Sequence, residues 1–145
     1  MQLRREKHSV SRLIVHFVFV VKYRRKVISN EVWAFLCDGF DLAAKRLDLI
    51  LVETNHDIDH VHLVVEYPPK ASISDIANAL KGNSSFVVRR DCAKELRGQL
   101  WGPAFWTPSY FAASCGGAPL ELLKLYVQSQ QTKAAINGGV STHKI

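Results

Sequence analysis

The sequence predicts an α+β fold of the ferredoxin-like kind, with an antiparallel sheet in the order β-α-β-β-α-β and an additional C-terminal helix. Three observations predict it. Apolar segments of strand length occur near residues 10–22, 49–55 and 60–67. Two longer segments repeat apolar side chains at helical spacing, and proline, glycine and Asx residues mark the turns. This order matches the split β-α-β pattern, which supports many functions and so indicates no chemistry by itself.

The composition is that of one globular domain. The 145 residues are 48% hydrophobic and 22% charged, which is normal for a soluble protein. We therefore expect a single domain over residues 1–145, with its core at about 8–137. Nineteen Lys and Arg against thirteen Asp and Glu give a net charge of +6. A moderately basic small domain suits a polyanionic partner such as nucleic acid, although many basic proteins bind none.

Neither a membrane segment nor a cysteine site is expected. The longest apolar run, residues 13–21, is interrupted by His16 and is shorter than the roughly 20 residues of a membrane-spanning helix. The N-terminal residues show no secretory signal pattern, so we expect a cytoplasmic protein. The three cysteines lie far apart and form no CxxC motif, which argues against a disulfide framework and against a cysteine-bound zinc ion.

The first strand is predicted over residues 10–22, where Val, Ile and Phe are concentrated. Both of its faces are largely apolar, which predicts a central strand covered on both sides. A basic cluster at residues 22–26 ends it. Ser29 or Asn30 can then cap a helix that continues to about Arg46. Apolar side chains recur there at helical spacing, namely Val32, Phe35, Leu36, Phe40 and Ala43.

A β-hairpin follows this helix. Residues 49–55 predict a second strand and residues 60–67 a third. The segment between them, residues 56–59, is predicted to be a turn because Asx residues favour turns. Pro68 and Pro69 end the third strand, since proline cannot continue a hydrogen-bonded ladder.

The remaining elements are a helix, a strand and a last helix. Ser72, with an aspartate three residues later, resembles a capping box and begins a helix over residues 72–97, which Gly98 ends. An aromatic-rich loop then leads into a fourth strand at residues 109–114. The last helix is predicted over residues 119–136, with a proline in its first turn and two glycines after its end.

His60 and His62 are the first candidate site residues. Side chains alternate between the two faces of a strand, so Val61, Leu63 and Val65 form the core face and both histidines point the other way. Imidazoles at i and i+2 lie roughly 7 Å apart along a strand and can converge on one metal ion. Two exposed or otherwise satisfied histidines explain a bare H-x-H motif equally well.

A metal site requires a third ligand besides the two histidines. His56 and Glu66 are local candidates, because they lie on either side of the pair in sequence. His56 precedes the turn and could instead have a structural role or face DNA. Glu66 shares the face but lies four residues beyond His62. His16, in the apolar first strand, is better explained as a satisfied core histidine.

Tyr126 and Gln130 form a second candidate pair on the predicted last helix. They are four residues apart, so they share one face. A tyrosine hydroxyl suits attack on a phosphodiester because the phosphotyrosine conserves the bond energy. Its pKa of roughly 10 means that it needs activation at neutral pH. A glutamine amide oxygen could complete a His-His-Gln metal site. A packed tyrosine and a solvated glutamine explain this helix better when it is taken alone.

The motifs are more specific in combination. Residues 59–65 read Asp-His-Val-His-Leu-Val-Val, residues 106–111 read Trp-x-x-x-Tyr-Phe, and residues 126–130 read Tyr-x-x-x-Gln. Together with the basic cluster after the first strand, they resemble the small single-tyrosine HUH transposases of bacterial and archaeal insertion sequences, the IS200-like superfamily. HUH stands for His, hydrophobic, His. The resemblance extends over almost the whole chain, from about residue 8 to residue 137.

The resemblance implies a function and a set of site residues. Members of this family bind a DNA hairpin and cleave and rejoin single-stranded DNA through a 5′-phosphotyrosine. Carried over, Tyr126 is the nucleophile, and His60, His62 and Gln130 hold Mg²⁺ or Mn²⁺. Members are homodimers whose tyrosine helix can complete the partner's active site. Gln131 is an alternative amide ligand, but the four-residue spacing favours Gln130.

Basic and aromatic residues add candidate DNA contacts. A solvated charged face explains the basic residues about equally well. The aromatic-rich segment 101–111 could stack on unpaired bases, although core or dimer packing explains most of it better. The open alternatives in function are a domesticated relative that processes chromosomal hairpins, a non-catalytic DNA-binding protein of the same fold, and a metal-dependent phosphohydrolase. The candidates for phosphate contacts are Lys22, Arg24, Arg25, Arg89 and Arg90.

Overall fold

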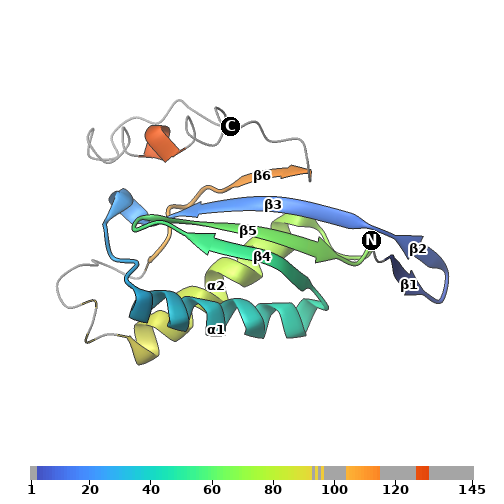
Figure 1. Cartoon of the computed structure of the whole chain (residues 1–145), viewed down its shortest axis with the longest axis horizontal. Helices are drawn as coiled ribbons and strands as arrows, with labels where there is room; N and C mark the ends of the chain where they lie inside the picture. Colours follow the sequence, from blue (N-terminus) through green and yellow to red (C-terminus); the bar gives the residue numbers. More distant parts are fainter. Residues whose placement is uncertain (1–2, 93, 95, 97–103, 115–126, 131–145) are drawn as a thin grey trace.

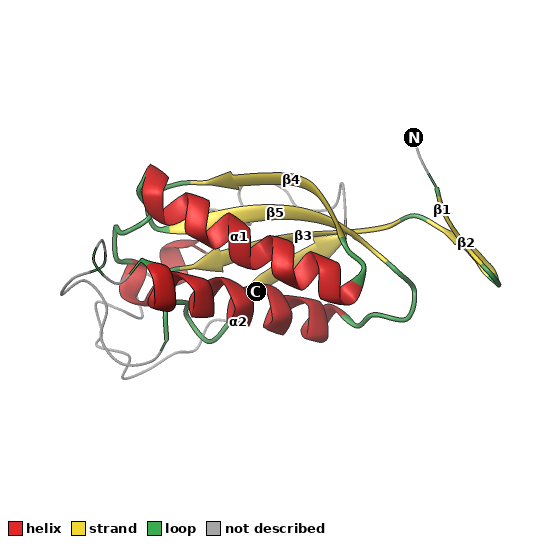
Figure 2. Cartoon of the chain, turned by 90° about the horizontal axis from the view of Figure 1, so that it is seen from below, coloured by secondary structure: helices red, strands yellow, loops and turns green. Residues whose placement is uncertain are grey.

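A computed structural model describes residues 3–92, 94, 96, 104–114 and 127–130 of the chain. In these residues a four-stranded antiparallel sheet is covered on one face by two helices, as Figures 1 and 2 show. The order of these elements is β-α-β-β-α-β, which confirms the predicted α+β arrangement. The sheet consists of β3 (Leu13–Val20), β4 (Ile50–His56), β5 (His60–Tyr67) and β6 (Phe111–Ser114), and the helices are α1 (Asn30–Leu47) and α2 (Ile73–Asp91).

Strand β3 is central in the sheet, which has the order β4-β5-β3-β6. It pairs antiparallel with both β5 and β6, so that Phe17 lies opposite Leu63 on one side and Ala112 on the other. Phe17 and Phe19 are fully buried under the helices, and Val18 is fully buried on the opposite face. This confirms the prediction of a central strand covered on both sides.

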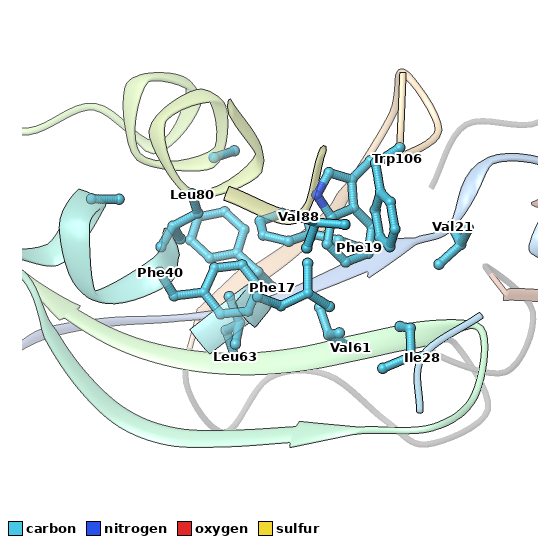
Figure 3. Close-up of a cluster of buried hydrophobic side chains, with 14 of the residues drawn as sticks. Phe17, Phe19, Val21, Ile28, Phe40, Val61, Leu63, Leu80, Val88 and Trp106 are labelled. Carbon is cyan, nitrogen blue, oxygen red and sulfur yellow. The ribbon is translucent and has the colours of Figure 1, made fainter. Parts of the chain in front are cut away.

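The main core lies between the sheet and the two helices. Figure 3 shows its large side chains meeting between the two layers, among them Phe17, Phe40, Leu63 and Leu80. The helices pack so closely that a Cβ atom at Gly39 of α1 would lie 2.3 Å from the Cα atom of Ser84 in α2. A glycine at this position therefore permits the contact between the helices.

The predicted helix starts are confirmed. Ser29 caps α1, since its Oγ atom accepts a hydrogen bond from the Val32 amide at 3.2 Å. Ser72 caps α2 in the same way, through a 3.1 Å bond from the Asp75 amide. Each cap satisfies an amide that has no partner within the helix. Neither described helix, nor any other in the described part of the chain, is long and apolar enough to cross a membrane.

Two features differ from the sequence-based predictions. The first strand begins at Leu13, and a short hairpin of β1 (Arg4–Glu6) and β2 (Ser9–Ser11) precedes it. These three-residue strands are mostly polar and show no apolar alternation that could predict them. Helix α2 ends at Asp91 instead of residue 97. The apolar spacing continues past that end because Cys92 and Leu96 still belong to the core.

The fourth predicted strand and the last predicted helix are described in part. Strand β6 occupies the last four residues of the predicted segment 109–114. Of the predicted helix 119–136, only residues 127–130 lie among the described residues, and they are helical. Tyr126 and Gln131 lie outside the described residues.

Candidate functional site

The face of the sheet opposite α1 and α2 carries His60 and His62. We call it the open face. Along β5 the burial alternates, so that Val61, Leu63 and Val65 are fully buried in the main core while both histidines are only partly buried. The prediction that both histidines point away from the core is therefore confirmed.

Cross-strand pairing fixes what surrounds the histidines. His60 lies opposite Val20 and His62 lies opposite Val18, both in β3. These two valines form a separate apolar cluster with Phe111. The imidazole pair therefore lies beside a small apolar patch on the open face.

The two imidazole rings are close, and both Nδ1 atoms have partners. The ring centroids lie 5.0 Å apart, with 71° between the planes. Nδ1 of His60 lies 2.7 Å from Oδ1 of Asp59, and Nδ1 of His62 lies 3.4 Å from Nε2 of His16. The other carboxylate oxygen of Asp59 accepts a 2.8 Å hydrogen bond from Nε of Arg24.

Burial keeps His62 neutral at pH 7. Burial, together with the nearby His60 and His16, lowers the pKa of His62 to about 4. Burial also lowers the pKa of His16. Burial raises the pKa of the Asp59 carboxyl, but the hydrogen bonds from His60 and Arg24 outweigh it, so that the net pKa is lowered. Neutral imidazole is the form that binds metal ions.

Gln130 lies in a helical turn that packs on the open face. Val127, the first described residue of this turn, contacts the apolar cluster of Val18, Val20 and Phe111, and Figure 1 shows the turn on the side of the sheet opposite α1 and α2. Three residues of helix advance by only about 4.5 Å, so Gln130 lies within one helical turn of this contact. Its exposed fraction is 2%.

The side-chain oxygen of Gln130 has no hydrogen-bond partner although it is buried. Its amide nitrogen donates to Oγ of Ser129 at 3.4 Å. A buried acceptor without a partner costs free energy and calls for an explanation such as an ion. Among the described residues no group of three or more His, Cys, Asp or Glu side chains could hold a metal ion. Within the described part of the chain, a third ligand at the histidine pair would therefore be of another type, and an amide oxygen is one.

The local candidates for a third ligand do not lie with the histidine pair. His56 pairs with Val61 and stacks on Trp33 of α1 at 4.5 Å between centroids, which places it on the helix-covered face. The carboxylate of Glu66 is held by Arg4 through hydrogen bonds of 2.6–3.1 Å. Both side chains thus have structural partners.

The interpretation of His16 as a core histidine is wrong. Its ring is only partly buried and lies on the open face, with its centroid 5.6 Å from that of His62. His16 lies opposite Val64 and is therefore a diagonal neighbour of His62 across the strand pair. Only the register between β3 and β5 places the two rings together, and the sequence does not specify that register.

The basic turn after β3 has an unusual backbone. Tyr23 and Arg24 have φ values of 61° and 50°, a region that residues other than glycine rarely adopt. The Tyr23 ring is 42% exposed and has Lys22 Nζ 5.5 Å and the Arg25 guanidinium 5.8 Å from its centroid. The turn therefore presents an aromatic ring together with two cations.

Of the two predicted arginine contacts in α2, Arg89 is the more unusual. Its Nε and Nη2 atoms are buried and have no hydrogen-bond partner. Arg90 is exposed, forms a 2.8 Å ion pair with Asp91 and covers the Phe86 ring. Figure 1 shows the C-terminal end of α2 at the same end of the molecule as the basic turn.

The described part of the aromatic-rich segment is mainly core. Phe105 is fully buried and Trp106 is 4% exposed. The indole nitrogen of Trp106 donates to Oγ of Ser84 at 3.0 Å. Nζ of Lys81 donates to the carbonyl oxygen of Thr107 at 2.7 Å. For these residues, packing rather than base stacking is the role that the structure supports.

Comparison with known proteins finds transposases by both family model and sequence similarity. The family model described as "Transposase IS200 like" matches residues 9–130. The ISDra2 transposase TnpA of Deinococcus radiodurans is 33% identical over 138 residues, which cover 92% of this chain and 94% of that protein. The transposase for insertion sequence element IS200 of Salmonella typhimurium is 28% identical over 101 residues, covering 70% of this chain and 66% of that protein.

Two solved structures share the fold. A crystal structure of a Deinococcus radiodurans R1 protein, provisionally named a transposase, superposes with a TM-score of 0.76 and 27% identity, over 88% of this chain and 97% of that one. The structure of a REP-associated tyrosine transposase bound to a REP hairpin superposes with a TM-score of 0.54. The latter covers 94% of this chain and 75% of that one at 12% identity, so the likeness concerns the fold alone.

Proposed function

The chain belongs to the family of IS200-like transposases, and on this premise we propose that it cleaves and rejoins single-stranded DNA at insertion-sequence ends. The nucleophile in this proposal is Tyr126. The observation that supports it most is the pairing of His60 and His62 on the open face, where the described turn that contains Gln130 also packs. These residues supply the ligands that such a reaction requires beside the tyrosine.

We assign Mg²⁺ or Mn²⁺ to His60, His62 and Gln130. The residues fit such an ion, because His62 is neutral at pH 7 and the Gln130 oxygen is buried without a partner. Imidazole nitrogen and amide oxygen together suit Mn²⁺, while Mg²⁺ prefers oxygen ligands. When bound, such an ion polarises the scissile phosphate and offsets the negative charge that develops on the leaving oxygen.

Tyr126 takes part in both steps, as the nucleophile in cleavage and as the leaving group in rejoining. In cleavage the phenolic oxygen gives up its proton and bonds to phosphorus, the bond from phosphorus to the 3′ oxygen breaks, and that oxygen takes up a proton. The products are a 5′-phosphotyrosine and a free 3′-OH. In rejoining, a 3′-OH attacks the phosphotyrosine and returns the tyrosine to its free form. No nucleotide cofactor is needed, because the phosphotyrosine retains the energy of the phosphodiester.

Recognition of a DNA hairpin by a homodimer completes the proposal. The REP-associated relative of the same fold was solved with a hairpin bound, which supports this mode of binding. We assign phosphate contacts to Lys22, Arg24, Arg25, Arg89 and Arg90. Two N–H groups of Arg89 are buried without an acceptor, so this side chain has unused hydrogen-bond donors. Nε of Arg24 is already engaged by Asp59.

Formation of a covalent adduct tests the proposal. The full-length protein is incubated with Mn²⁺ or Mg²⁺ and a labelled single strand that carries a hairpin from the DNA bordering its gene. We expect a labelled species that survives denaturing electrophoresis, and we expect Tyr126→Phe to abolish it while hairpin binding persists.

Two other outcomes would contradict the proposal. Cleavage by Tyr126→Phe would instead support a phosphohydrolase that activates water. Hairpin binding by the wild type without cleavage in either metal would support a non-catalytic DNA-binding protein of the same fold.

A further inference from the structure

We propose that Asp59 and His16 are positioning residues for the histidine pair. Each occupies the Nδ1 atom of one ligand, Asp59 that of His60 and His16 that of His62. Both Nε2 atoms are then left to bind the metal ion. This inference rests on the function proposed above, because it concerns the same ion.

The hydrogen bond from His60 to Asp59 determines the tautomer of His60. An ionised carboxylate can only accept hydrogen bonds, so Nδ1 of His60, 2.7 Å from Oδ1, carries the proton of this bond. A His60 ring that binds a metal ion then does so through the lone pair on Nε2. Asp59 is 3% exposed as a whole residue. Its carboxylate cannot turn away without losing its hydrogen-bond partners.

Two further contacts fix Asp59. Nε of Arg24 donates to Oδ2 at 2.8 Å, so each carboxylate oxygen has a separate partner. The amide of Val21 donates to the Asp59 carbonyl at 2.9 Å, which ties the backbone of the β4–β5 turn to the end of β3. Arg24, Asp59 and His60 are thus joined by two contacts that lead from the basic turn to the histidine pair.

His16 acts on His62 through an imidazole–imidazole hydrogen bond. Of two neutral imidazoles in contact, one donates and the other accepts. If Nε2 of His62 is the metal-binding atom, Nδ1 of His62 carries the proton and Nε2 of His16 accepts it, over 3.4 Å. This bond is longer than that of His60 and its acceptor is neutral, so we expect a smaller effect from His16 than from Asp59.

The test compares Asp59→Asn with a matched control, Glu66→Gln. Glu66, in β5, is a second buried carboxylate and is 6% exposed. Like Asp59, it is paired with an arginine, in this case Arg4. It lies at the opposite end of β5 from His60. Both variants lose a buried charge pair, so both should lose thermal stability. Only Asp59→Asn should weaken binding of Mn²⁺.

The affinity for Mn²⁺ is measured in the absence of DNA, from the electron paramagnetic resonance signal of the unbound ion. We expect Asp59→Asn to weaken the affinity by about 10–100-fold, the range for loss of a partner of a metal-bound histidine, and Glu66→Gln to leave it unchanged. For His16, we expect His16→Phe to weaken binding and His16→Gln, which retains an acceptor, to restore most of it. Wild-type affinity in folded Asp59→Asn and His16→Phe overturns the inference.

A second measurement separates this inference from the metal assignment itself. Nitrogen-15 NMR of the metal-free protein reports which ring nitrogen carries the proton. We expect Nδ1–H for both His60 and His62, and Nε2–H on either ring overturns the positioning role assigned for that ring. Failure of the wild type to bind Mn²⁺ overturns the metal assignment instead, and the tautomers can still be read.

Discussion

The imidazole rings of His60 and His62 lie 5.0 Å apart on the open face of the sheet, between centroids. They belong to alternate residues of one strand, so the backbone of β5 alone brings them together. The third proposed ligand, Gln130, comes from a segment that packs on the valines paired with these histidines. The proposed metal site thus has a local half, the two histidines of β5, and a tertiary half, Gln130 from a distant segment. Variants can test the two halves separately.

The local half is tested by His60→Ala with His56→Ala as its control. Loss of a direct ligand should reduce Mn²⁺ affinity by more than the roughly 100-fold that loss of a hydrogen-bonded partner costs, and DNA cleavage should fall with it. His56 lies on the helix-covered face against Trp33, so its removal should leave cleavage unchanged. Calorimetric titration and a cleavage assay measure both effects. Undiminished cleavage by His60→Ala would refute the metal assignment.

The tertiary half is tested by Gln130→Met. Removing a buried acceptor that has no partner should not destabilise the metal-free protein, since such a group costs about 1–3 kcal/mol. Mn²⁺ affinity should nevertheless fall. Gln128→Met, at an exposed position of the same turn, should leave Mn²⁺ affinity unchanged. Thermal unfolding and Mn²⁺ titration of the two variants decide the matter, and a destabilised Gln130→Met that keeps full affinity would show a structural role.

Packing of the helices gives a prediction that is independent of function. Gly39→Ala places a methyl group against the backbone of Ser84 and should destabilise the fold by about 1–3 kcal/mol, as overpacking does. Gly82→Ala meets no atom within 4 Å and should stabilise α2 by roughly 0.5–1 kcal/mol. Urea unfolding of both variants gives the free energies. Equal effects of the two substitutions would mean that the helices are less closely packed than described.

Lys81 joins α2 to the segment before β6. Its ammonium group donates to the carbonyl oxygens of Thr107, Pro108 and Ser109 at 2.7–3.2 Å. Lys81→Met should therefore reduce the free energy of unfolding by about 1.5–3 kcal/mol, as for a hydrogen bond to a charged group. Urea unfolding at pH 7 measures this change, and a variant as stable as the wild type would contradict the assigned role.

The same lysine predicts a pH dependence. Burial lowers its pKa from 10.5 to about 8 in the folded protein. Between these two values the unfolded chain binds more protons than the folded one, so Lys81 should make the free energy of unfolding rise with pH in this window. Below pH 8 both states are protonated and the contribution is constant. The difference between wild type and Lys81→Met isolates the effect, and a falling difference over pH 8–10.5 would show the opposite shift.

The helices and strands that could be predicted are those whose side-chain spacing, caps or terminal prolines are visible in the sequence. Strand β5 follows from its alternation and its terminal prolines, and α1 follows from its serine cap and apolar spacing. The end of α2 was not predictable in this way, because Cys92 and Leu96 keep the helical spacing after the helix has ended.

The candidate site could be predicted only where its residues are neighbours in sequence. His60 and His62 share a face by strand alternation alone. The contact of His16 with His62 depends on the β3–β5 register, and a shift of one residue would turn His16 to the other face. The ion pair between Arg24 and Asp59 likewise joins residues 35 apart in the chain. No sequence pattern specifies either contact.

In the proposed reaction, Tyr126 forms the covalent bond to DNA. The most direct measurement is mass spectrometry of the protease-digested adduct formed with Mn²⁺ and a hairpin-bearing single strand. We expect the nucleotide mass to be carried by the peptide that contains Tyr126, attached through a 5′ phosphate. A nucleotide on any other residue, or cleaved DNA without a modified peptide, would contradict the assignment of Tyr126 as the nucleophile.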